Sequence, residues 1–161
     1  MPEKNPHTTS EALKARMKTL QLATLGEDNE PHCGYTPFIF DGPDLIVFIS
    51  QLAVHTRDLL ANSNVGVMLI DDEQDSNNLF ARCRVRYQCN AIVIKPEEDA
   101  YTLLLDRYHE RQGKVVSLIR QLPDFVLFRL RPKSGVLVMG FGDAYRIEGD
   151  NMDEFVHVSS T

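Results

Sequence analysis

The chain has 161 residues, of which 43% are hydrophobic and 25% charged, and its net charge is −6. This is ordinary for one folded domain over residues 1–161, in which we expect residues 1–10 to form a flexible tail. The negative charge argues against non-specific nucleic-acid binding, which needs a clustered positive surface. No stretch approaches the roughly 20 apolar residues of a membrane span, and the three cysteines lack disulfide-framework or zinc-site spacing. We therefore predict a cytoplasmic protein that binds neither nucleic acid nor membrane.

The predicted elements are mostly short strands joined by tight turns. In chain order, the pattern predicts a helix over residues 12–18, strands over 19–25, 31–40 and 45–49, a helix over 51–62, strands over 65–70 and 80–94, a helical region over 95–121 with a break near Gly113, and strands over 125–131, 135–139 and 144–147. Successive hairpins with few crossovers favour an antiparallel barrel over a parallel, doubly wound sheet. The predicted fold class is mainly β.

One strand leads directly into polar groups. The apolar run over residues 45–49 ends at Ser50, and the helix start that follows carries His55, Thr56 and Arg57 in succession. Thr56 offers a hydroxyl group, and Arg57 offers a planar guanidinium that suits phosphate or carboxylate. The spacing fits an anion or cofactor site and equally a solvated first turn of a helix.

Three arginines alternate along the predicted strand over residues 80–94. Because strand side chains point to opposite faces in turn, Arg82, Arg84 and Arg86 share one face. That face is either a polar surface exposed to water or a basic surface for a cofactor's phosphate or propionates.

The histidines and motifs narrow the chemistry further. We interpret His32 and His109 as surface residues, whereas His157 lies near the chain end, where it is either unconstrained or able to reach a ligand. The sequence contains no nucleophile elbow, P-loop or HExxH motif.

Seven stretches in order resemble the FMN-binding split-barrel superfamily (pyridoxamine 5'-phosphate oxidase-like) and, within it, the HugZ/HutZ-type haem utilisation proteins. They are TLQLATL, GYTPF, ISQLAVHTRDL, VMLIDDE, LFARCRV, LPDFVLFRL and GFGDAY, and they run from Thr19 to Tyr145. The resemblance implies a six-stranded antiparallel split β-barrel with flanking helices. It also implies a homodimer with cofactor sites at the subunit interface.

The resemblance also implies site residues. By position, the cofactor-binding residues would be Tyr35, Thr36, Ser50, His55, Thr56, Arg57, Arg82 and Arg84. In the haem-degrading members a histidine near the C-terminus ligates the iron, and an aspartate supports it across the interface; here that aspartate would be Asp124. The family's ligand lies a few residues beyond the position of His157, so His157 is expected as a substitute ligand. Asp124 and His157 are the expected catalytic residues.

Two cofactors and three functions remain open at this point. The protein is expected to bind haem and degrade it as a haem oxygenase-like oxidoreductase, or to bind FMN as a flavin oxidoreductase, or to carry either cofactor without turnover. The expected partners are a second copy of the chain, haem or flavin, and a small-molecule or protein electron donor.

Overall fold

The computed structural model describes residues 4–159. The strands are β1 (Thr19–Leu25), β2 (Pro31–Pro37), β3 (Ile39–Asp41), β4 (Asp44–Ser50), β5 (Asn64–Ile70), β6 (Arg84–Ile94), β7 (Phe125–Gly140), β8 (Asp143–Glu148) and β9 (Glu154–His157). The helices are α1 (Pro6–Arg16), α2 (Val54–Ala61), α3 (Ala100–Gln112) and α4 (Val115–Ile119), with 3-10 turns at Glu73–Asp75 and Leu79–Ala81. None of the described helices is both long and apolar enough to cross a membrane.

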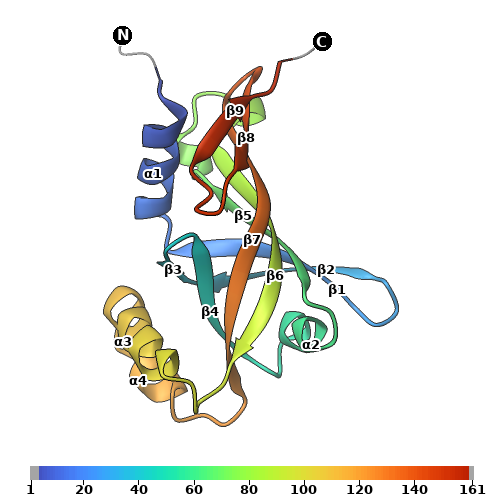
Figure 1. The fold of residues 1–161 in the computed structure, drawn as a ribbon, viewed down its shortest axis with the longest axis vertical. Coiled ribbons are helices and arrows are strands. Elements are labelled where there is room, and N and C mark those ends of the chain that lie inside the picture. The colour runs from blue at the N-terminus through green and yellow to red at the C-terminus, as the bar shows by residue number, and fades with distance from the viewer. Residues whose placement is uncertain (1–3, 160–161) are drawn as a thin grey trace.

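The strands form one strongly curved antiparallel sheet (Figure 1). Its order is β2-β1-β5-β6-β7-β4-β3, and β8 and β9 extend it from β7. The two ends of this order, β2 and β3, are separated in the chain by Phe38 alone, so the sheet has to curl back on itself. Within residues 4–159 no ladder joins β2 to β3, which leaves the barrel split.

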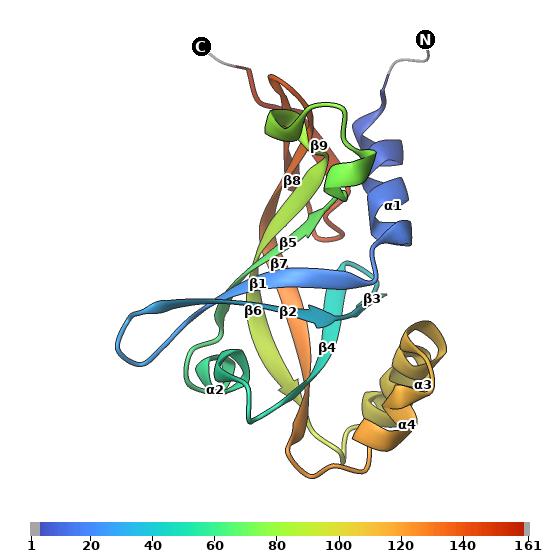
Figure 2. The same ribbon diagram turned by 180° about the vertical axis from the view of Figure 1, so that it is seen from behind.

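The predicted fold class is confirmed. Six strands of seven or more residues, β1, β2 and β4 to β7, form the barrel, and the shorter strands β3, β8 and β9 are added to them. Helix α1 lies beside the β8–β9 end, whereas α2 and the α3–α4 pair lie toward the other end (Figures 1 and 2).

Strand β4 explains why the run over residues 45–49 is continuously apolar. Leu45, Val47 and Ile49 belong to the barrel core, and Ile46 and Phe48 pack in a second core against α3 and α4. Both faces of the strand are therefore buried. Burial of each such side chain contributes about 1.5–3 kcal/mol to the stability of the fold. This burial fixes the end of β4, where Ser50 lies.

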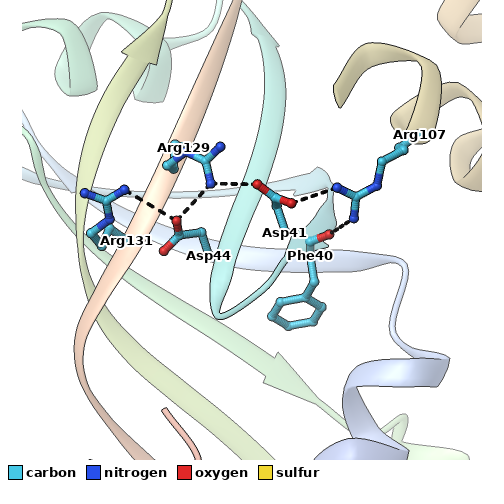
Figure 3. Close-up of polar contacts among 6 residues, drawn as sticks. All are labelled: Phe40, Asp41, Asp44, Arg107, Arg129 and Arg131. Carbon is cyan, nitrogen blue, oxygen red and sulfur yellow. Dashed lines mark hydrogen bonds and ion pairs between the residues drawn. The ribbon is translucent and has the colours of Figure 1, made fainter. Parts of the chain in front are cut away.

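A charged network on the outside of the barrel ties α3 to the sheet (Figure 3). Arg107 of α3 donates to Asp41 at 2.8 Å, and Arg129 of β7 donates to Asp41 and Asp44 at 2.9 Å each. The hydrogen bond from Arg107, helped by Arg129, holds the pKa of Asp41 below its ordinary value even though partial burial opposes this. The network fixes the helical pair that covers one side of the site.

The N-terminal helix begins earlier than predicted. Asn5 caps it by accepting from the backbone N–H groups of His7 and Thr8, and Pro6 occupies the first turn, where its missing N–H costs nothing. Of the expected flexible tail, residues 6–10 are thus helical, and residues 1–3 lie outside the described part of the chain.

Strand β9 was not predicted, and the predicted strand over residues 31–40 is divided at Phe38 into β2 and β3. The bounds of β6 and β7 also differ from the prediction. β6 begins at Arg84, because Phe80 lies in a 3-10 turn and Arg82 follows that turn. β7 is one long strand where two were predicted, and Pro132 lies within it, where the register with β6 shifts between Gln88 and Cys89. Proline is tolerated at such an irregularity because the ladder bond is already interrupted there.

Candidate functional site

A small cavity lies between the sheet and the α3–α4 pair. It has a volume of about 270 Å³, and its polar lining includes three of the expected cofactor residues, Thr36, Ser50 and His55, beside Tyr108. The remaining lining is largely apolar. Tyr108 donates to the carbonyl of Pro37 at 2.8 Å, and burial raises its pKa to about 12, so it stays a neutral phenol at physiological pH.

Ser50 lines this cavity, and Asp124 lies beside Ser50. The Ser50 hydroxyl donates a short hydrogen bond to Oδ2 of Asp124 and accepts from the backbone N–H of Leu52 at 3.1 Å. The backbone N–H of Gln51 donates to the Asp124 carbonyl at 2.8 Å. The Asp124 carboxylate is thereby held where β4 ends and β7 begins, because Ser50 and Phe125 are paired across those strands.

His55 projects from the first turn of α2 onto β2. The ring lies so close to Gly34 that a Cβ there would be 2.6 Å from Nδ1. Burial lowers the pKa of His55 below its ordinary value, and the charge of Asp58 opposes this only in part. His55 is therefore a neutral imidazole at neutral pH, able both to donate and to accept a hydrogen bond.

The other residues expected around α2 lie apart from the cavity. Thr56 is completely buried, and its hydroxyl has no hydrogen-bond partner within the described chain. Arg57 is exposed and lines a separate hollow of about 420 Å³ together with His32 and Asp58. Tyr35 is 69% exposed on β2. Thr36, Ser50, His55 and Asp124 are thus the expected residues that the fold brings together, and we call them the β4–α2 cluster.

The two expected arginines of the β6 segment lie elsewhere. Arg82 donates to the Asp71 carbonyl at 3.0 Å and lies 3.7 Å from the Glu73 carboxylate, and Arg84 donates to the Arg82 carbonyl at 3.0 Å. Arg84 is paired with Val138 near the end of β7, whereas Ser50 is paired at its start. The separation is about 40 Å along the strand at 3.3 Å per residue.

His157 lies at that same end of β7. Strand β9 places it opposite Tyr145 of β8, with ring centroids 5.0 Å apart at 76°. Its Nε2 lies 3.7 Å from the carboxylate of Asp143, and its side chain is half-exposed. Within one chain, Asp124 therefore does not support His157, and the two remain a proposed pair between subunits. We call Arg82, Arg84 and His157 the β6–β9 cluster.

Between the two clusters the sheet presents an open, mostly apolar surface. The hollow there measures about 680 Å³ and is lined mostly by small or apolar residues, such as Ala23, Gly34 and Gly66, together with polar ones such as Arg86 and Gln88. Sequence reasoning missed this surface, because Ala23, Gly34 and Gly66 belong to three different strands and only the pairing of those strands brings them together.

Sequence reasoning also missed a polar cluster beneath the β1–β2 hairpin. The buried carboxylate of Asp58 accepts from the Thr24 hydroxyl at 2.7 Å and lies 2.6 Å from Nδ1 of His32. His32, expected to be a simple surface residue, is therefore paired. No local pattern indicates this contact, because the partners are far apart in the sequence. Among the residues that the structure describes, no three or more His, Cys, Asp or Glu side chains are grouped to hold a metal ion.

Comparison with known proteins fits this architecture. Residues 7–139 match the model of the family described as pyridoxamine 5'-phosphate oxidase. The chain is 38% identical over 141 residues to heme oxygenase HutZ of Vibrio cholerae. The aligned region covers 88% of this chain and 80% of the relative. The crystal structure of HutZ, described as a heme storage protein, superposes with a TM-score of 0.81 at 34% identity and covers 86% of this chain and 98% of that one.

A further solved structure, Campylobacter jejuni ChuZ, has a TM-score of 0.86 at 28% identity. The superposition covers 98% of this chain but only 65% of the ChuZ chain, so the present chain spans about two thirds of that relative. The resemblance to HutZ-type proteins within the split-barrel superfamily is confirmed, and the chain belongs to the pyridoxamine 5'-phosphate oxidase family.

Proposed function

We propose that this protein binds haem in a pocket between two copies of the chain and degrades it oxidatively, as a haem oxygenase-like enzyme. One observation supports this most: the candidate residues form two clusters at opposite ends of β7, separated by an open apolar surface. A two-fold dimer through that surface would bring the β4–α2 cluster of one chain toward the β6–β9 cluster of its partner. The 38% identical relative is named a heme oxygenase, which supports haem as the ligand.

The dimer rests on the character of the open surface. Contiguous apolar surface of this kind on a soluble protein marks an interaction site, and Gly66 and Ala23 allow close approach of a second backbone. The oligomeric state tests this by light scattering after size-exclusion chromatography. Wild type is expected to be a dimer and Gly66→Arg a monomer; a wild-type monomer at all concentrations would refute the dimer.

The residues present fit an anionic, iron-containing ligand. Helix α2 begins after Ala53, which provides no side-chain cap within the described chain, so the backbone N–H groups at its N-terminus favour a propionate or phosphate. Arg57 is exposed beside it and suits the same groups. His157 is a half-exposed imidazole near a carboxylate, the combination that orients a ligating ring. Bound haem supplies the oxygen chemistry, and the chain's own residues bind, orient and enclose it.

Haemin titration monitored by absorption tests the haem proposal. We expect wild type to give a shifted Soret band and His157→Ala to lose it. His109→Ala, which removes a histidine of α3 that does not line the cavity, should behave as wild type. An unchanged spectrum in His157→Ala would remove that residue from iron ligation. If wild type binds no haemin, the proposal fails.

FMN is the second candidate, favoured by the family and by the uncapped start of α2 next to Arg57. This arrangement would hold a phosphate without any contribution from His157. The spectrum of protein purified without added cofactor separates the two cases, because haem gives a Soret band and FMN gives two flavin bands.

Turnover separates an enzyme from a carrier, a distinction raised by the two descriptions of HutZ as heme oxygenase and heme storage protein. An enzyme should consume reductant, from a small molecule or a protein donor, and form a bilin; a carrier should do neither. We also propose a cytoplasmic location, where the free cysteines Cys33, Cys83 and Cys89 would remain reduced.

A further inference from the structure

Helix α2 cannot fix its own position. It has eight residues, no side-chain cap at Ala53 and no acidic residue in its first turn. Isolated helices of this length are unstable in water, and their position is set by tertiary contacts. The same helix carries His55 and Arg57, which the proposed function places beside the cofactor. Whatever holds α2 therefore determines where these two side chains stand.

The strongest polar contact of α2 is made by Asp58. One oxygen of its buried carboxylate, Oδ2, accepts from the Thr24 hydroxyl at 2.7 Å and lies 2.6 Å from Nδ1 of His32. Thr24 and His32 are directly opposite each other in the β1–β2 ladder. The carboxylate thus contacts both strands of the hairpin, through two residues that are paired with each other. Figure 2 shows α2 lying beneath that hairpin.

A second contact of α2, also with β2, fixes the helix further. Gly34 lies two residues after His32, so both face α2, and the His55 ring packs directly over Gly34. On the helix, His55 and Asp58 are three residues apart and share one face. Two positions on one face of β2 therefore contact two positions on one face of α2. Together these contacts fix both the position and the rotation of the helix relative to the strand.

The surrounding charges favour an ion pair here. The hydrogen bond with Asp58 raises the pKa of His32, partial burial opposes this, and the carboxylates of Asp28 and Glu30 add to the increase. Burial would raise the pKa of Asp58, but the bonds from His32 and Thr24, with the nearby charge of Arg57, leave it lower than usual.

We propose that Asp58 and His32 are positioning residues for the cofactor site. They lock α2 onto β1 and β2 and so fix where His55 and Arg57 meet the cofactor; their role is to hold the helix in place. This inference rests on the proposed function only in that α2 contacts the cofactor, whether haem or FMN.

Haemin and FMN titrations of four variants test the inference. Asp58→Asn removes the charge, His32→Leu removes the donor, and His32→Gln keeps a donor and should restore part of the affinity. Glu30→Gln is the matched control, because it removes a carboxylate from the same hairpin without touching Asp58. We expect the Kd to rise at least about tenfold in Asp58→Asn and His32→Leu, as when a group that orients a ligating side chain is lost, and to stay near wild type in Glu30→Gln.

A spectroscopic readout separates positioning from a merely structural role. Because coupling between two sites is reciprocal, binding of zinc protoporphyrin, a diamagnetic haem analogue, should raise the pKa of His32 measured by NMR in wild type and Glu30→Gln. The shift should be absent in Asp58→Asn. If Asp58→Asn does not fold, the comparison of His32→Leu with His32→Gln decides.

Three outcomes are distinguishable. Weakened binding with partial recovery in His32→Gln supports the inference. Wild-type affinity in both Asp58→Asn and His32→Leu overturns it while the proposed function stands. Wild type that binds neither haemin nor FMN overturns the proposed function, and the inference with it.

Discussion

The close approach of Gly34 to His55 makes Gly34→Ala an informative substitution. The added Cβ would lie 2.6 Å from Nδ1 and 3.4 Å from Cε1 of His55. Ordinary carbon contacts are about 3.5–4.0 Å, so the ring has to move by about 1 Å. The His55 side chain is half-buried and can rotate, whereas the β2 backbone is fixed by its ladder with β1. We expect the ring, not the strand, to be displaced.

This displacement has two measurable consequences. The loss of stability should be about 1 kcal/mol, at the lower end for an overpacked site, or a decrease in Tm of about 2–4 °C. Cofactor affinity should also fall, by about 10- to 100-fold, as when a group that orients a metal-binding side chain is disturbed. Because burial lowers the pKa of His55, moving the ring toward solvent should also raise that pKa toward its ordinary value.

The assays are thermal unfolding, haemin or FMN titration, and NMR titration of His55. Gly140→Ala is the control for stability and for the pKa, because a Cβ there meets no atom within 4 Å. If the pKa of His55 is the same in Gly34→Ala as in Gly140→Ala, the ring has not moved and the argument is wrong.

Two further predictions concern the framework. Gly135→Ala places a Cβ 2.8 Å from the buried ring of Tyr87, so urea unfolding should show a loss of about 1–3 kcal/mol, whereas an equal stability in Gly140→Ala and Gly135→Ala would contradict this. Arg107→Ala removes the main cause of the lowered pKa of Asp41. A carboxylate with a lowered folded pKa contributes stability above its unfolded value of 3.8, and that contribution is lost as pH falls through the folded pKa. The stability difference between wild type and Arg107→Ala should therefore be largest near neutral pH and shrink below the unfolded value; a difference that is constant with pH would show that Asp41 plays no part.

Much of the fold could be predicted because its signals are local. The apolar run over residues 45–49 identified β4, and Gly113 correctly marked the break between α3 and α4, where its φ is +94°. The errors came where a local signal was overridden. Two strands were predicted, over residues 125–131 and 135–139, yet the irregular register with β6 accommodates Pro132 within one continuous strand. Phe80 continued an alternating pattern, yet the chain turns before β6 begins.

The site was less predictable, because it depends on contacts across the sheet. Ser50 and Asp124 meet only because β4 pairs with β7, and no spacing in the sequence indicates that pairing. The same holds for His32 and Asp58, which β1, β2 and α2 bring together. Family resemblance indicated Ser50 and Asp124 by position, but it provided no signal for His32.

The state of α2 links these observations physically. A helix start that is to bind an anionic group has to leave its backbone N–H groups without a side-chain cap, and Ala53 leaves them so. Such a helix lacks the stabilisation that a cap provides, about 1 kcal/mol. A helix of eight residues also has little intrinsic stability. Its stability must then come from tertiary contacts of the helix body, where the buried carboxylate of Asp58 joins it to two strands. An uncapped start and an anchored helix body are thus complementary requirements of the helix that we propose to contact the cofactor.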